Sequence, residues 1–170
     1  PFINDDLRLK THNRLNPPKI YHGIFWEDNP KMMYLGMQDQ FYTLSMFDAQ
    51  AWYVRDLIVN KASLPTDAEI SEDISQWMAK EGKLEDPLQM IDFQTEYTKD
   101  LCSMVDYPEI DMELIRKHFH DWEHHKEDDI LQYRNKSFSS AVTGTVAPLH
   151  HTNWLDAMDD SMETFMNTKF

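Results

Sequence analysis

The sequence predicts an α/β fold in which a short β unit comes first and a mostly helical region follows. Residues 19–26, "KIYHGIFW", alternate and are rich in β-forming side chains, and residues 31–37, "KMMYLGM", follow after the turn sequence "EDNP". From Ser45 onward, apolar residues recur at helical spacing instead. We therefore expect two strands that are neighbours in a sheet, then helices, with an irregular segment over residues 1–18.

Two helices are predicted directly after the β unit. The apolar stripe of the first consists of Phe47, Ala51, Val54 and Ile58. At the start of the second, Thr66 and Glu69 have the spacing of a capping box, in which each side chain bonds to the other residue's backbone amide. The stripe of this second helix consists of Ile70, Ile74 and Trp77. We expect the helix to end before Gly82.

Further helices are predicted downstream. Asp86 followed by Pro87 is a helix start, because proline suits the first helical position. The stripe of this third helix consists of Met90, Phe93, Tyr97, Leu101 and Met104. A fourth helical region runs from about Asp111 toward Arg134, and the loop "TGTVAP" precedes a last helix that starts near Asn153.

Composition narrows the class of protein. The chain has 170 residues, of which 41% are hydrophobic, so it is of one-domain size and can bury a core. A formal net charge of −14 argues against nucleic acid and anionic membranes as partners, but suits small cationic or neutral ligands. One cysteine, Cys102, rules out an internal disulfide and favours a reducing compartment such as the cytoplasm. No apolar run approaches the roughly 20 residues of a membrane span.

The β unit predicts a larger context. A two-stranded hairpin is marginal alone and needs further strands to pair with. The first residue is Pro1, and no start of its own precedes the predicted strands. We therefore expect the chain to be separated from an N-terminal portion of the same protein that supplies the other strands.

A histidine-rich stretch, "HFHDWEHHKEDD", could be a metal site or a solvated helix face. His120 and His124 have the i, i+4 spacing that places two imidazoles on one ion. The stretch is not an H-E-x-x-H motif, and His118 and His125 point elsewhere on a helix. With no cysteine nearby, we expect no structural metal.

Two other features leave alternatives open. "YLGMQDQFYT" places amides, an acid and hydroxyls between the end of a predicted strand and a helix start, where backbone amides can receive an electronegative ligand edge. The same segment could be a turn that only satisfies its own backbone. Trp122 lies three residues after Phe119 on one helix face, so it is either a core residue or a wall of a ligand pocket.

Longer stretches resemble a known family. "FWEDNPKMMYLGMQDQ", "FYTLSMFDAQAWYVRDLI", "WEHHKEDDI" and "TGTVAPLHHTNW" are similar to the bacterial trimethylamine monooxygenases, a branch of the flavin-containing monooxygenases. Ile24, just before the first stretch, replaces a valine. The likeness covers essentially the whole chain.

The resemblance implies the C-terminal piece of a flavoprotein with two dinucleotide-binding domains. Residues 1–60 would be the returning part of the FAD domain, and residues 61–170 a helical extension that packs on the rest of the enzyme. Neither glycine-rich dinucleotide fingerprint occurs here, and the sequence has only four glycines. The piece alone is therefore expected to be inactive.

The resemblance also implies site residues. Asp39 would belong to the catalytic polar network, and Gln40 and Thr43 would lie beside the isoalloxazine ring of FAD. Phe41, where the bacterial enzymes commonly have tryptophan, would line the substrate pocket.

Two more site residues come from the helical region. Trp122 would close the substrate pocket, and Arg134 would approach NADPH.

The implied reaction consumes NADPH and O2 and oxygenates trimethylamine to its N-oxide through a C4a-hydroperoxyflavin. Other tertiary amines and sulfides are also expected substrates, because the family accepts soft nucleophiles. The expected partners are the N-terminal portion and a small amine, and a homodimer stays open. The alternative is a stand-alone acidic helical module for interaction or metal binding.

Overall fold

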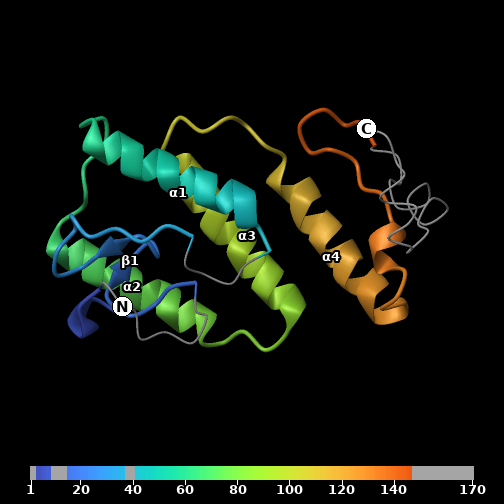
Figure 1. The fold of residues 1–170 in the computed structure, drawn as a ribbon, viewed down its shortest axis with the longest axis horizontal. Coiled ribbons are helices and arrows are strands. Elements are labelled where there is room, and N and C mark those ends of the chain that lie inside the picture. Colours follow the sequence, from blue (N-terminus) through green and yellow to red (C-terminus); the bar gives the residue numbers. More distant parts are fainter. Residues whose placement is uncertain (1–2, 9–14, 37–40, 147–170) are drawn as a thin grey trace, which may run out of the picture. The chain divides into compact units, whose positions relative to one another are not determined.

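The fold is described by a computed structural model for residues 3–8, 15–36 and 41–146 (Figure 1). Its elements are η1 (Asp5–Leu7), β1 (Ile20–Tyr21), β2 (Phe25–Trp26), α1 (Thr43–Ile58), α2 (Asp67–Glu81), α3 (Pro87–Ser103), α4 (Met112–Asp128) and η2 (Tyr133–Asn135). The chain divides into two compact units, Pro1–His120 and Asp121–Phe170, and each is described by itself. No helix among the described residues is long and apolar enough to cross a membrane.

The first predicted strand is a hairpin in itself, so the prediction of one strand over residues 19–26 was wrong. β1 pairs antiparallel with β2, with Tyr21 opposite Phe25. His22 and Gly23 between them have φ angles of 48° and 64°, and the Ile24 amide donates to the Tyr21 carbonyl at 2.9 Å. Positive φ at both central residues is typical of a tight β-turn of the primed type, and with Ile24 these residues form the three-residue connection between Tyr21 and Phe25.

The second predicted strand is reduced to one bridge, from Phe25 to Met33. Two backbone hydrogen bonds support it, from the Tyr34 amide to the Ile24 carbonyl at 2.8 Å and from the Trp26 amide to the Met32 carbonyl at 3.0 Å. The predicted adjacency of the two segments is therefore confirmed, while the predicted regular strand over residues 31–37 is not found in its described part.

Helices α2 and α3 follow their sequence signals. The capping box of Thr66 and Glu69 is present, and α2 ends at Glu81, before Gly82. Asp86 caps α3 by accepting a hydrogen bond from the Gln89 amide at 2.8 Å. The buried stripes agree with prediction at Ile70, Ile74 and Trp77 of α2 and at Phe93, Tyr97 and Leu101 of α3.

Helix α1 buries a different face from the one predicted. Of the predicted stripe, Val54 is buried, but Ala51 is exposed and Ile58 is 65% exposed. The buried face instead carries Met46, Ala49, Gln50, Tyr53 and Val54. The apolar period was ambiguous because three buried residues of α1, Gln50, Tyr53 and Asp56, are polar or phenolic.

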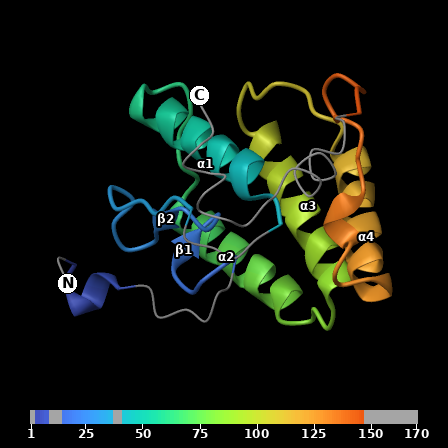
Figure 2. The same cartoon turned by 45° about the vertical axis from the view of Figure 1, so that its right-hand side comes forward.

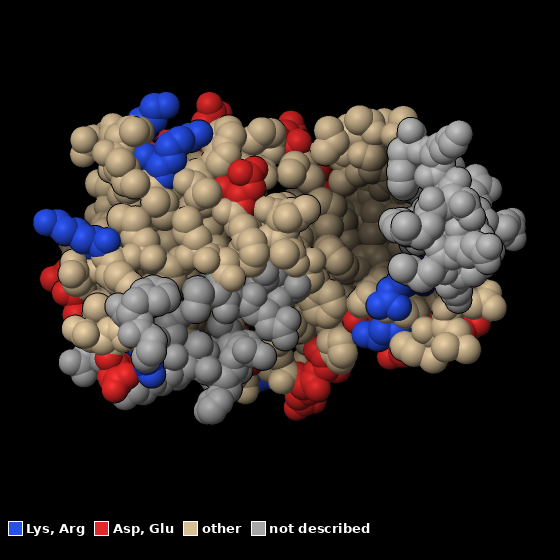
Figure 3. Space-filling model, viewed as in Figure 1, with Lys and Arg blue, Asp and Glu red and all other residues tan. Residues whose placement is uncertain are grey.

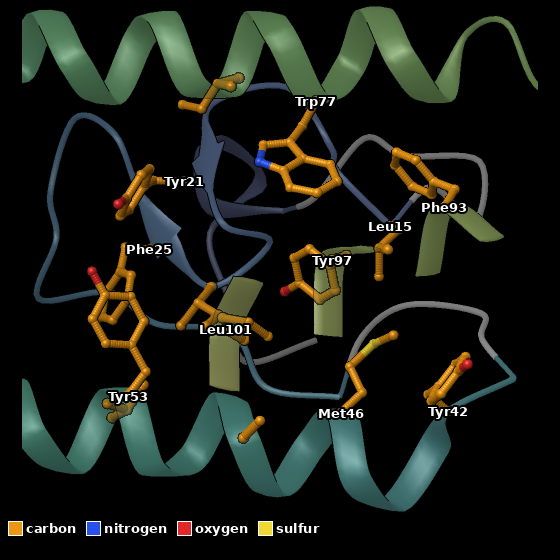
Figure 4. Close-up of a cluster of buried hydrophobic side chains, with 14 of the residues drawn as sticks. Leu15, Tyr21, Phe25, Tyr42, Met46, Tyr53, Trp77, Phe93, Tyr97 and Leu101 are labelled. Atoms are coloured by element: carbon orange, nitrogen blue, oxygen red, sulfur yellow. The ribbon is translucent and has the colours of Figure 1, made fainter. Parts of the chain in front are cut away.

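The hydrophobic core of the first unit lies between α1, α2, α3 and the hairpin (Figure 4). Trp77 points inward from α2 and Met46 and Tyr53 point inward from α1, with Tyr21 and Phe25 of the hairpin between the two helices. In Figures 1 and 2, β1 lies against α2, and α1 lies against α3. These aromatic contacts hold the hairpin in place without further strands.

Helix α4 ends at Asp128, earlier than the predicted approach to Arg134. A short turn of 3-10 helix, η2, follows and contains Arg134. The predicted last helix near Asn153 lies outside the described residues.

Candidate functional site

The segment that sequence reasoning singled out runs from the end of the β unit to the start of α1. Gly36 has a φ angle of 69°, and a Cβ there would lie 3.1 Å from the Phe47 ring. Both the positive φ and the close ring favour glycine at this position. The chain therefore turns sharply at Gly36, immediately before residues 37–40.

The two amides that flank residues 37–40 bond to buried glutamines. The Gly36 amide donates to Gln50 Oε1 of α1 at 3.2 Å, and the Phe41 amide donates to Gln94 Oε1 of α3 at 2.7 Å. Gln50 is 0% exposed and Gln94 is 1% exposed. The sequence analysis missed both glutamines, because an amide side chain on a helix carries no signal of its own.

Aromatic packing fixes the residues just after this segment. The ring centroid of Phe119 lies 5.7 Å from that of Phe41 and 4.9 Å from that of Tyr42. The Tyr42 hydroxyl lies 2.6 Å from Thr95 Oγ1, and burial raises the pKa of Tyr42 to about 12. Phe41 is therefore part of an aromatic wall that stays uncharged at neutral pH.

The start of α1 has no compensating acidic side chain in its first turn. The N-cap residue Tyr42 makes no side-chain capping hydrogen bond, and the first turn contains no acidic residue. Thr43 is exposed, and the apolar Leu44 beside it is 83% exposed. The positive end of the helix dipole is thus not compensated by an acidic side chain of its own first turn.

Asp39 and Gln40 lie outside the described residues. Of the predicted site residues in this segment, the structure brings Phe41 and Thr43 together at the start of α1.

The second unit brings two other predicted residues onto one tyrosine. Trp122 and Tyr133 have ring centroids 5.3 Å apart, and the Arg134 guanidinium lies 4.4 Å from the centre of the Tyr133 ring. Tyr133 is buried, while Arg134 is exposed. The Lys126 ammonium lies 4.8 Å from the centre of the Trp122 ring and pairs with the buried Glu123. The sequence analysis did not single out Tyr133, because a single tyrosine outside an apolar stripe has no distinctive pattern.

The histidine-rich stretch makes contacts to acidic residues. His120 Nε2 lies 2.8 Å from Asp92 Oδ1, and His124 Nδ1 lies 3.7 Å from Glu127 Oε2. Within the described part of the chain, no group of three or more metal-ligating side chains is arranged to hold an ion.

A polar cluster lies where the hairpin turn meets α2 and α3. The imidazole of His22 is 1% exposed, with Nε2 3.7 Å from Asp73 Oδ1 and Nδ1 3.7 Å from Asp100 Oδ2. Burial lowers the pKa of His22 to about 4. Burial, together with the charge of Asp100, raises the pKa of Asp73 to about 6. A neutral imidazole therefore separates the two carboxyls, which border an open groove of about 510 Å³.

Charged side chains of both signs lie on the surface of the protein (Figure 3). On the face shown in Figure 3, acidic and basic side chains are both present and are interrupted by uncharged surface. This pattern offers no continuous basic strip of the kind that binds nucleic acid on that face.

Comparison with known proteins identifies the relatives. The chain is 64% identical to the trimethylamine monooxygenase of Pelagibacter sp. (strain HTCC7211) over 169 residues, which are 99% of this chain and 38% of that protein. The chain corresponds to the C-terminal part of trimethylamine monooxygenases. The proteins of the same name from Pelagibacter ubique (strain HTCC1002) and Methylocella silvestris are 60% and 52% identical and are covered to 38% and 37%.

A solved structure agrees with this assignment. The crystal structure of Tmm from Pelagibacter sp. strain HTCC7211 matches 97% of this chain and 38% of that chain, with a TM-score of 0.88 at 65% identity. The chain thus spans less than two-fifths of the length of these trimethylamine monooxygenases. No family model matches the chain.

Proposed function

We propose that this chain is the C-terminal part of an FAD- and NADPH-dependent monooxygenase that oxygenates trimethylamine and related soft nucleophiles. The observation that carries the proposal is the 64% identity to a trimethylamine monooxygenase over 99% of the chain. Identity at this level over nearly the whole chain supports a shared chemistry. The 170 residues alone are inactive in this proposal, because they carry neither dinucleotide fingerprint.

The start of α1 fits a flavin. A flavin has an apolar ring with electronegative oxygen and nitrogen atoms at one edge. The exposed Leu44 offers apolar contact, and the first turn of α1 offers backbone amides with no acidic residue beside them. Residues 1–60 would then complete the FAD domain, and residues 61–170 would pack on the rest of the enzyme.

In this proposal the residues near α1 bind and orient the cofactor. Gln40 and Thr43 donate hydrogen bonds to the ring edge, and Asp39 holds ordered water or the nicotinamide amide in the catalytic polar network. Bound FAD, reduced by NADPH, would activate O2, of which one oxygen atom goes to the substrate and the other to water. A protein nucleophile is not required, so the task of these side chains is position and protonation state.

The substrate contacts are aromatic. Phe41 provides a half-buried aromatic edge that excludes water, and Trp122 provides a ring face that attracts a cationic amine. Lys126 already lies over the Trp122 ring within the second unit, so an ammonium is compatible with this face. The exposed Arg134 guanidinium, supported by Tyr133, suits a phosphate of NADPH.

The test uses the complete protein, purified and supplied with FAD. We expect a yellow protein that consumes NADPH faster when trimethylamine is added. It should form nearly one molecule of N-oxide for each NADPH consumed. The 170-residue chain, treated in the same way, should retain no flavin. A complete protein that binds FAD but shows no amine-dependent oxygenation, across tertiary amines and sulfides, would contradict the proposal. Zinc in stoichiometric amount after chelator washing would favour the metal-binding alternative instead.

A further inference from the structure

We infer that Gln50 and Gln94 are positioning residues that hold the backbone on either side of residues 37–40, at Gly36 and at Phe41, and thereby set the geometry of the segment proposed to face the flavin. The inference rests on the proposed function, because it assigns the turn to the cofactor. It goes beyond that function by naming two helix residues that make no contact with cofactor or substrate in this proposal.

Gly36, which precedes residues 37–40, is held through α1. The Gly36 amide donates to Gln50 Oε1 at 3.2 Å, and Gln50 Nε2 donates to the Tyr97 hydroxyl at 3.0 Å. The Tyr97 hydroxyl in turn donates to the backbone carbonyl of His22 in the hairpin turn. Gln50 therefore connects the flavin-facing segment to α3 and to the hairpin through one continuous set of hydrogen bonds.

Phe41, which follows residues 37–40, is held through α3. The Phe41 amide donates to Gln94 Oε1 at 2.7 Å, the shorter of the two anchoring bonds. One helical turn further on, Thr98 Oγ1 donates to the Gln94 backbone carbonyl at 2.8 Å. The Phe41 side chain, whose ring packs on Phe119, is thus oriented from its own backbone as well as from its ring.

Burial makes these two contacts informative. Both glutamine side chains are essentially inaccessible, at 0% and 1% exposure. A buried amide is costly unless it is hydrogen-bonded, and an apolar residue at either position would pack in the core without that cost. The glutamines hold two amides that no helix or strand satisfies. Their common feature is that these amides flank the same four residues.

The experiment compares Gln50→Leu and Gln94→Leu in the complete protein with Thr66→Ala as a matched control. Thr66 caps α2 and, within the described part of the chain, makes no hydrogen bond to Gly36 or Phe41. Its replacement by alanine lowers the stability of the protein. The first reading is hydrogen exchange in the flavin-free protein, followed by mass spectrometry of the peptide that covers residues 34–43. The second is the FAD dissociation constant and the absorption and fluorescence spectra of the bound flavin.

We expect exchange in this peptide to rise roughly tenfold in each leucine variant, since a backbone amide loses its buried acceptor. The FAD dissociation constant should also rise roughly tenfold, with a shifted flavin spectrum and a larger share of NADPH oxidation ending as peroxide. Thr66→Ala should change none of these readings. Gln94→Glu, which keeps an acceptor oxygen for the Phe41 amide, should restore slow exchange and much of the FAD affinity.

Two results would overturn the inference. Unchanged exchange of the peptide 34–43 in the leucine variants would show that the glutamines do not anchor the backbone at Gly36 and Phe41. Raised exchange with flavin affinity, spectrum and peroxide yield equal to those of Thr66→Ala would reduce the glutamines to structural residues. A wild-type protein that binds no FAD would instead refute the proposed function, whatever the exchange result. If a leucine variant does not fold, the asparagine variant at the same position, which withdraws the oxygen by one methylene, gives the same readings.

Discussion

Helices α1 and α2 belong to the same unit and share one core, yet they are stabilised in different ways. Helix α2 has a complete capping box, acidic residues Asp67 and Glu69 in its first turn and Lys80 in its last. Helix α1 starts without a side-chain cap or an acidic residue in its first turn, and it buries Gln50 and Asp56. α2 is thus specified by local sequence, whereas α1 depends on contacts to its neighbours.

The strongest test of this comparison is core truncation on α1. Met46 is 0% exposed, so Met46→Ala should lower the free energy of unfolding by about 3 kcal/mol through lost burial and a cavity. Ile58, which the sequence pattern places in a buried stripe with Val54, is 65% exposed, so Ile58→Ala should cost less than about 0.5 kcal/mol. Urea unfolding of the chain measures both. Equal losses would mean that the predicted stripe is the buried face after all.

The next test concerns the turn before α1. Gly36→Ala forces a non-glycine residue to a φ angle of 69° and places its Cβ 3.1 Å from the Phe47 ring. We expect a loss of about 2 kcal/mol, measured by thermal unfolding. Gly144→Ala is the control, because Gly144 also has a positive φ, 70°, but its Cβ would meet no atom within 4 Å. If both variants lose the same stability, backbone strain alone explains the effect and the Phe47 contact adds nothing.

A pH series tests the polar contact between α2 and the hairpin. The pKa of Asp73 is raised from 3.8 to about 6, so its stabilising contribution is present below about pH 4 and is lost as the pH rises through 6. Asp73→Asn removes this loss. The variant should therefore gain about 1–2 kcal/mol over the wild type between pH 4 and pH 7, a figure reduced for the part of the carboxyl that is exposed.

His22 acts in the opposite direction in the same pH range. Its pKa is lowered to about 4, so its contribution is present above 6.5 and is lost as the pH falls through 4. Because His22 Nε2 lies 3.7 Å from Asp73 Oδ1, the two contributions are coupled and do not cancel in the difference between variant and wild type. A difference that does not change with pH, in parallel urea titrations, would show that Asp73 is ionised normally.

The smallest expected effect is at the start of α2. Thr66→Ala removes the capping hydroxyl that accepts a hydrogen bond from the Glu69 amide. It should lower the free energy of unfolding by about 1 kcal/mol. Ser45→Ala near the start of α1 is the counterpart, and it should cost clearly less, because the Ser45 hydroxyl donates to the Tyr42 carbonyl at 3.3 Å and caps no amide. Unfolding curves that rank the two the other way would contradict the view that α2, unlike α1, is locally capped.

The sequence predicted the parts of the fold that depend on neighbouring residues in the chain. The cap at Thr66, the start at Asp86 and the stripes of α2 and α3 are all local signals, and all are confirmed. The hairpin inside residues 19–26 was missed, because the turn at His22 and Gly23 interrupts an alternation that continues on both sides. The α1 face was missed because Gln50 is buried by contacts to Gly36 and Tyr97, which are distant in sequence.

The candidate site was predicted only through family resemblance. Phe41 and Thr43 are together at the start of α1, and Trp122 and Arg134 both contact Tyr133. Their roles stay predictions, as do those of Asp39 and Gln40, which lie outside the described residues. Periodicity and composition contain no information on which polar side chains would face a cofactor.

The most direct test of the central claim is a crystal structure of the complete protein with FAD bound. We predict that the edge of the isoalloxazine ring lies within hydrogen-bonding distance of the segment from Gln40 to Thr43, with Gly36 and Phe41 still bonded to Gln50 and Gln94. A flavin bound away from the start of α1, with Thr43 facing only solvent or protein, would contradict the account.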